Sequence, residues 1–137
     1  MTRERKKFQP LTSKNVCQIY RLLHRRKLVS FPVNKDAEFK LDSVVGNITG
    51  SNFGIENYKT KKEKAVAYLW FLIKAHAFTD GNKRTATLTF LVVADKNNLK
   101  IKPGWLEVLD ELAVWIEAYK FEDYQDWIRK ISKDIFE

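Results

Sequence analysis

The spacing of apolar residues is helical along most of the chain, and this periodicity limits the fold more than any other feature of the sequence. Residues 13–27 are the first example, because four apolar residues there follow the i, i+3, i+4, i+7 pattern of a helix face. These four are Val16, Ile19, Tyr20 and Leu23. No stretch alternates apolar and polar residues for long enough to indicate a main sheet. The sequence therefore predicts an all-α fold.

The middle of the chain predicts two helices joined by a short polar loop. Thr60 and Glu63 have the spacing of a capping box, in which the threonine caps the first turn and the glutamate reaches back to the cap amide. The apolar face that follows predicts a helix running to about His76. A second apolar run, over residues 86–94, is hydrophobic on nearly all sides and predicts a central helix.

Two more helices are predicted toward the C-terminus, over residues 105–119 and 124–135, because each stretch has apolar residues at helical spacing. Residues 29–59 break the pattern, and their glycines and asparagines predict loops. Within them, residues 40–45 fit a short helix or a short strand. We therefore expect a bundle of five or six helices.

The length of 137 residues suits one domain that buries its own core, so we expect a single domain over residues 1–137 with a basic tail over about residues 1–12. The single cysteine, Cys17, excludes an intramolecular disulfide and a cysteine zinc cluster, as is typical of a reducing compartment. No apolar run approaches the roughly 18 residues of a membrane span, and residues 1–7 lack the apolar stretch of a signal peptide. We expect a cytoplasmic protein that does not associate with membranes.

The net charge of +8 is concentrated at the N-terminus. Residues 1–30 carry nine basic residues and one acidic residue, whereas residues 103–137 have a net charge of −5. A basic segment can bind nucleic acid or an acidic protein, or it can simply be solvated. The sequence has no zinc finger and no RNA-recognition signature, so nucleic acid is the weaker interpretation.

Residues 76–84, His-Ala-Phe-Thr-Asp-Gly-Asn-Lys-Arg, carry the strongest chemical signal in the chain, and we call them the signature segment. A glycine turn joins the two central helices here, so the second helix starts with free backbone N–H groups beside Lys83 and Arg84. Such a helix start favours an anion such as phosphate. Asp80 adds a carboxylate where Mg²⁺ could bridge to phosphate oxygens, and His76 could accept a proton from an attacking hydroxyl.

Each of these residues also has an ordinary structural explanation. A histidine at the end of a helix often interacts only with the helix dipole, and Asp-Gly-Asn is a common turn sequence. The combination of a base, a carboxylate, a glycine turn, a helix start and two cations within nine residues is what indicates a functional site.

The signature segment resembles the motif of the Fic/Doc superfamily, His-x-Phe-x-[Asp/Glu]-[Gly/Ala]-Asn-[Gly/Lys]-Arg, at every specified position. The resemblance extends from about residue 53 to residue 98, and the length is similar to that of the small Doc (death-on-curing) toxins of toxin–antitoxin pairs. It implies a Fic/Doc-type helical bundle with a small flap. It also implies an enzyme that uses ATP and Mg²⁺ to modify a hydroxyl of a target protein.

The resemblance also implies a role for each matching residue. His76 would be the general base that acts on the target hydroxyl, and Asp80 would help to hold Mg²⁺. Asn82 would orient the nucleotide phosphates, Arg84 would clamp them, and backbone amides from Gly81 onward would complete the anion cradle.

Two positions bear on the type of transfer. Relatives that transfer AMP usually have glycine in place of Lys83 and a second arginine in place of Thr87. This chain is instead similar to Doc, which binds ATP in the reverse sense and transfers the γ-phosphate to a threonine of translation elongation factor Tu, arresting translation. Gly81 is nearer to the AMP-transferring consensus. The resemblance favours a protein kinase, with AMP transfer and a catalytically silent binding module that uses the basic N-terminus as alternatives.

Residues 50–56 fall where family members have the flap that pairs with the extended chain of the target, although an ordinary loop fits them equally well. The inhibitory motif of the family, a Ser or Thr followed four residues later by Glu, is absent from the sequence. Inhibition is therefore expected in trans, from a separate antitoxin with a disordered acidic tail.

Overall fold

Seven helices make up most of residues 7–137, which are the residues that the computed structural model describes. Residues 1–6, half of the predicted basic tail, lie outside this range. The all-α prediction is confirmed, although seven helices exceed the five or six expected. The elements are α1 (Ser13–Arg25), α2 (Ala37–Thr49), β1 (Ser51–Asn52), β2 (Ile55–Glu56), α3 (Lys61–Ala75), α4 (Asn82–Lys96), α5 (Pro103–Glu107), α6 (Leu109–Ala118) and α7 (Tyr124–Ile135).

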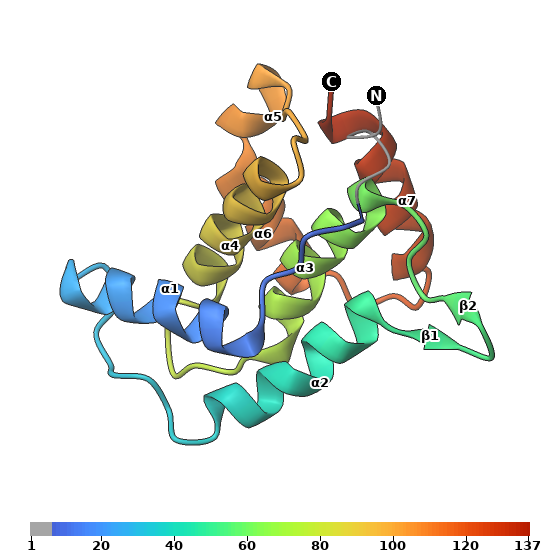
Figure 1. Cartoon of the computed structure of the whole chain (residues 1–137). Coiled ribbons are helices and arrows are strands. Elements are labelled where there is room, and N and C mark those ends of the chain that lie inside the picture. The colour runs from blue at the N-terminus through green and yellow to red at the C-terminus, as the bar shows by residue number, and fades with distance from the viewer. Residues whose placement is uncertain (1–6) are drawn as a thin grey trace.

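Helix α3 lies at the centre of the bundle and packs against α2, α4, α6 and α7 (Figure 1). Its residues 64–73 are all buried except Phe71, which is half-buried. The sequence predicted a central position for residues 86–94, which lie in α4. Helix α4 does pack on α1, α3 and α6, but Leu88 and Leu91 on it are only half-buried because they line an open cavity. This open face of α4 makes room for the site described below.

The start of α3 is fixed by Thr60, as predicted. The Thr60 hydroxyl accepts a hydrogen bond from the Glu63 amide at 2.9 Å. The Glu63 carboxylate also reaches back, but it accepts from the Lys59 amide at 3.1 Å rather than from the cap amide. These bonds satisfy two N–H groups at the helix start, and α3 then runs without interruption to His76.

Helix α2 lies where the sequence predicted loops, with at most a short helix or strand at residues 40–45. The chain is helical over 13 residues there, because Ala37, Leu41 and Ile48 are fully buried against the neighbouring helices α1 and α3. A glycine inside a helix costs about 1 kcal/mol relative to alanine, and the burial of these three side chains outweighs that cost at Gly46.

The helix predicted over residues 105–119 is in fact two helices. Helix α5 ends at Glu107 and α6 begins at Leu109, and Val108 between them has φ −111° and ψ 15°, outside helical geometry. The apolar spacing continues across this break, which is why periodicity alone indicated one helix.

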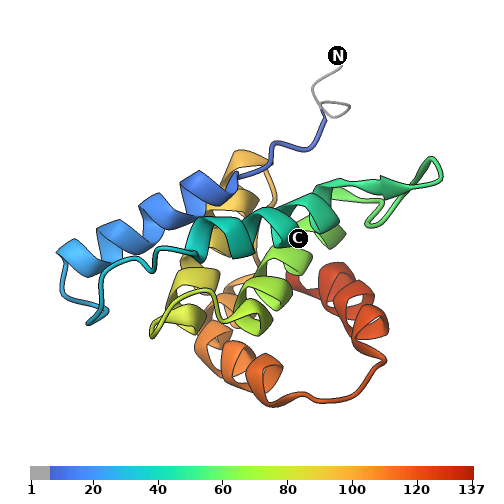
Figure 2. The same ribbon diagram turned by 90° about the horizontal axis from the view of Figure 1, so that it is seen from below.

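Residues 50–56, which the sequence allows to be either a flap or an ordinary loop, contain a small strand pair that does not lie near the signature segment. Strands β1 and β2 pair in antiparallel register at the N-terminal end of α3, whereas the signature segment begins at its C-terminal end (Figures 1 and 2). The 15 residues of α3 span about 22 Å. Of these two interpretations, the position of residues 50–56 favours the one without a role at this site, because a whole helix separates them from it.

Candidate active site

Two residues with positive φ shape the loop between α3 and α4. His76 ends α3 with φ 46° and ψ 49°, and Gly81 precedes α4 with φ 71°. Gly81 is also packed closely, since a Cβ atom at this position would collide with the side chain of Val29. Glycine is therefore required here both for its backbone conformation and for its small size.

Asn82 holds the loop in shape through both ends of its side-chain amide. Its Oδ1 accepts from the Phe78 amide at 3.1 Å, and its Nδ2 donates to the Phe78 carbonyl at 2.9 Å. Both residues are buried, and the Phe78 ring stacks on Tyr20 with 4.1 Å between ring centroids. The predicted role of Asn82 was to orient phosphates. The hydrogen bonds that it makes here fix the loop, and one Nδ2 hydrogen is left for a ligand.

The start of α4 offers N–H groups that no side chain of the described residues caps. The first turn of a helix leaves its N–H groups without carbonyl partners. The first N–H to bond back to the loop is that of Thr85, to the Gly81 carbonyl at 2.9 Å. The first turn also lacks acidic residues. Free N–H groups and the positive end of the helix dipole make this helix start a suitable site for an anion.

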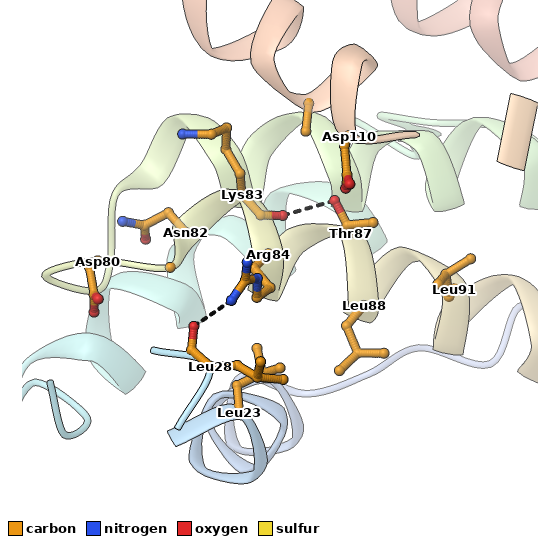
Figure 3. A pocket seen from close by; sticks show the side chains of 12 residues that line it. Leu23, Leu28, Asp80, Asn82, Lys83, Arg84, Thr87, Leu88, Leu91 and Asp110 are labelled. Atoms are coloured by element: carbon orange, nitrogen blue, oxygen red, sulfur yellow. Dashed lines mark hydrogen bonds between the residues drawn. The ribbon is translucent and has the colours of Figure 1, made fainter. Parts of the chain in front are cut away.

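A cavity of about 680 Å³ lies beside this helix start, between α1, α4 and α6 (Figure 3). Its polar end is formed by the signature segment. From there the cavity continues along α4 past Thr87, where the walls become apolar apart from Asp110. The Thr87 hydroxyl is turned onto its own helix and donates to the Lys83 carbonyl at 2.9 Å. The lining residues are Leu23, Leu28, Asp80, Gly81, Asn82, Lys83, Arg84, Thr87, Leu88, Leu91, Asp110 and Ala113.

The two cations of the signature segment already have partners. Lys83 Nζ lies 2.9 Å from Glu117 Oε1 on α6, and Arg84 Nη1 donates to the Leu28 carbonyl at 2.6 Å. A phosphate that bound here would exchange these partners for its own oxygens.

Asp80 is held by neutral donors from α1 and from the segment that follows it. The Ser30 amide and the Tyr20 hydroxyl each donate to one carboxylate oxygen, both at 3.0 Å. The Ser30 bond is the main cause that lowers the pKa of Asp80, while burial and the Asp80 carboxylate raise the pKa of Tyr20 to about 12. Asp80 is thus an anion at neutral pH.

The residues fit a magnesium ion that is bound mainly by substrate. The described residues contain no cluster of three or more metal-ligating side chains. Mg²⁺ typically keeps several waters and binds through one or two carboxylates together with phosphate oxygens. Asp80, which is ionised and lines the cavity beside the anion-binding helix start, provides one such carboxylate.

His76 lies at the rim and not among the residues that line the cavity. Its side chain is 59% exposed, and its Nε2 is 3.9 Å from Glu117 Oε2. The imidazole is therefore accessible to a protein substrate that approaches from solvent. The predicted site residues His76, Asp80, Gly81, Asn82, Lys83 and Arg84 thus lie around one loop, with the histidine at its outer edge.

Sequence reasoning missed two contributors to this site. The first is Glu117, which contacts both His76 and Lys83. The second is the segment of residues 26–36, here called the α1–α2 connection, which supplies partners to the signature segment. Besides the contacts above, Asn34 and Thr79 exchange two hydrogen bonds of 3.1 Å. The sequence carries no local signal for these contacts, because the partners are more than 30 positions apart.

A comparison with protein-family models matches residues 10–94 to the Fic/DOC family, so the match includes the whole signature segment. No curated protein and no solved structure matches the chain. Among residues 7–137, no helix is long and apolar enough to cross a membrane. Enzymes of the Fic/DOC family generally transfer nucleotide-derived groups to proteins. The match covers more than half of the chain and agrees with the all-α fold and the loop geometry, and the protein therefore belongs to the Fic/DOC family.

Proposed function

We propose that this protein is a Doc-type kinase that transfers the γ-phosphate of Mg-ATP to a hydroxyl of a target protein. The observation that carries this proposal is the layout of the cavity, which has anion-binding groups at one end and apolar walls along α4 at the other (Figure 3). If the base of ATP occupies the apolar part beside Leu88 and Leu91, the γ-phosphate, which is farthest from the base, lies at the loop. The γ-phosphate is then the phosphate nearest to His76.

The phosphate end of the site acts by position and charge. Lys83, Arg84 and the first N–H groups of α4 would bind the phosphate oxygens once their present partners are exchanged. Phosphoryl transfer asks a protein mainly for such positioning and charge neutralisation. AMP-transferring relatives have an arginine at the position of Thr87, and this arginine binds the terminal phosphate. The neutral Thr87 cannot play that part, which supports a terminal phosphate bound at the loop.

His76 would act as the general base. One ring nitrogen takes the proton of the target hydroxyl, and the hydroxyl oxygen forms a bond to the γ-phosphorus. The bond from that phosphorus to the oxygen bridging to the β-phosphate breaks, and ADP leaves. Asp80 would hold Mg²⁺ together with phosphate oxygens, and the ion would neutralise their charge.

The target chain would approach over the α1–α2 connection and not over the hairpin. Leu28 and Phe31 are each 50% exposed there, next to the loop that Ser30 and Asn34 contact. By the resemblance to Doc, we propose a threonine of translation elongation factor Tu as the target and a separate antitoxin as the inhibitor. With such a target the protein would act in the cytoplasm.

Transfer of label from ATP tests this function. The purified protein is incubated with Mg²⁺, a cell lysate and ATP labelled either at the γ-phosphate or at the α-phosphate. Label from the γ-phosphate alone supports the kinase, and label from the α-phosphate supports AMP transfer. His76→Ala should abolish labelling, whereas His24→Ala, which removes the other histidine of the chain, should preserve it.

The absence of label from either position, with the same result for His76→Ala, would refute both transfer reactions. A binding module that uses the basic N-terminal residues would then be the better explanation. Growth arrest upon expression that disappears in His76→Ala would connect catalysis to toxicity, and arrest that persists in this variant would separate them.

A further inference from the structure

The Glu117 carboxylate, which comes from α6, lies between two side chains of the signature segment. Its Oε1 is 2.9 Å from Lys83 Nζ, and its Oε2 is 3.9 Å from His76 Nε2. The Glu117 side chain is 35% exposed, so it is partly shielded from water at this place. One carboxylate thus contacts the proposed base and one proposed phosphate ligand, each through a different oxygen.

Glu117 is an anion in this arrangement. The hydrogen bond from Lys83 is the main cause that lowers its pKa, and the nearby charges of His76 and Lys120 act in the same direction. Lys74 also faces this residue, and its Nζ donates to the Glu117 backbone carbonyl at 3.3 Å. The carboxylate is therefore surrounded by cationic and titratable groups from α3, α4 and the segment after α6. Its shortest contact among these groups is the one with Lys83.

The Lys83 contact differs from the other contacts of the signature segment. Arg84 bonds to a neutral carbonyl, and Asp80 bonds to a neutral amide and a neutral hydroxyl. Among the described residues, Glu117 is the one charged partner of these three side chains. A phosphate that binds Lys83 must displace an anion there, and the displaced anion has His76 as its next nearest partner.

We propose that Glu117 is a positioning residue that binds Lys83 in the free protein and is released to His76 when nucleotide binds. This inference rests on the proposed function. Phosphate oxygens bind the Lys83 ammonium group in place of Glu117. The Glu117 carboxylate then accepts a hydrogen bond from the N–H of one ring nitrogen of His76. That hydrogen bond fixes the tautomer in which the other ring nitrogen is free to accept the proton of the target hydroxyl, and it stabilises the imidazolium that results.

The proposal predicts that Glu117→Gln increases the affinity for nucleotide and at the same time lowers kcat. Loss of the anion frees Lys83, so the variant should bind Mg²⁺ and the imido-bridged, non-hydrolysable analogue of ATP about two- to fivefold more tightly. The variant should also transfer phosphate about tenfold more slowly, because the imidazole is no longer held by a carboxylate. Calorimetry measures the dissociation constant, and labelling at saturating ATP measures kcat.

Glu111→Gln is the matched control, because it removes the same charge from an exposed position of the same helix. It should change neither the dissociation constant nor kcat. A second test uses Lys83→Met, in which Glu117 has no lysine to release. If Glu117 and the phosphate compete for Lys83 as proposed, adding Glu117→Gln to Lys83→Met does not tighten binding of the analogue any further.

The outcomes distinguish this inference from the proposed function. If Glu117→Gln binds the analogue no more tightly than the wild type, or if it tightens binding equally in the Lys83→Met background, the exchange of partners is wrong. The kinase proposal survives that result provided that label transfer still depends on His76. If the wild-type protein binds no ATP analogue at all, both proposals fail.

Discussion

Asn82 should stabilise the protein and preorganise the phosphate site at the same time, and the substitution Asn82→Ala tests this double role. The substitution removes two hydrogen bonds to the backbone of Phe78 and leaves a buried N–H and a buried C=O without partners. Each lost bond contributes about 1 kcal/mol, and an unpaired buried group costs about 1–3 kcal/mol. We expect the free energy of unfolding to fall by about 2–4 kcal/mol.

Asn97 provides a matched control at the other end of α4. It is also buried, and its side chain bonds to the Gln9 backbone at 2.7 and 3.0 Å and to the Val93 carbonyl at 2.8 Å. Asn97→Ala should therefore lower stability by a similar amount. It should leave nucleotide binding unchanged, because Asn97 does not contact the loop that presents the amides to the phosphates.

Urea unfolding measures the stability of both variants, and calorimetry with the non-hydrolysable ATP analogue measures binding at a temperature where each variant remains folded. Asn82→Ala should bind the analogue at least tenfold more weakly than Asn97→Ala, about 1.4 kcal/mol in binding free energy. Equal binding by the two variants would refute the claim that Asn82 preorganises the site. A loss of stability below about 0.5 kcal/mol in Asn82→Ala would refute the hydrogen-bond argument itself.

Three further predictions concern the groups around Asp80 and Gly81. The pKa of Asp80 is lowered mainly by the hydrogen bond from the Ser30 amide. The stability that the carboxylate adds is therefore fully present above its unfolded pKa of about 3.9, and it is lost as the pH falls through the lower folded-state pKa. Thermal unfolding of Asp80→Asn should depend less on pH between about pH 5 and pH 2 than that of the wild type. Gly81→Ala should lower the free energy of unfolding by about 1–3 kcal/mol, because of the positive φ and the collision with Val29. Adding Val29→Ala to this variant should restore part of the lost stability, as measured by chemical denaturation. If no stability is restored, the collision is not the cause. Tyr20→Phe removes the hydroxyl whose single hydrogen is shared between the Phe31 carbonyl at 2.7 Å and the Asp80 carboxylate at 3.0 Å. The free energy of unfolding should fall by about 1–2 kcal/mol, as measured in urea. An unchanged urea midpoint would contradict this contact.

The outcome at α2 shows why part of the fold was not predictable from the sequence. Gly46 and the asparagines around it favour a loop by local propensity, and the helix forms because Leu41 and Ile48 are buried against other helices. The sequence also did not predict the break between α5 and α6 at Val108. In this case the local pattern favours a helix, since the apolar spacing remains helical across the break. A local sequence pattern therefore predicts a helix or loop correctly only where tertiary packing favours the same conformation.

The sequence by itself determined the all-α class, the Thr60 cap and the signature loop, because each depends on residues within about one or two helical turns of one another. Only the tertiary structure decided which residues surround that loop. Glu117 reaches Lys83 from 34 positions away, and Ser30 reaches Asp80 from 50 positions away. It also decided that the hairpin lies at the far end of α3 (Figure 2). Side-chain partners that are this distant in the chain leave no periodic trace in a single sequence, and they come together only when the helices pack.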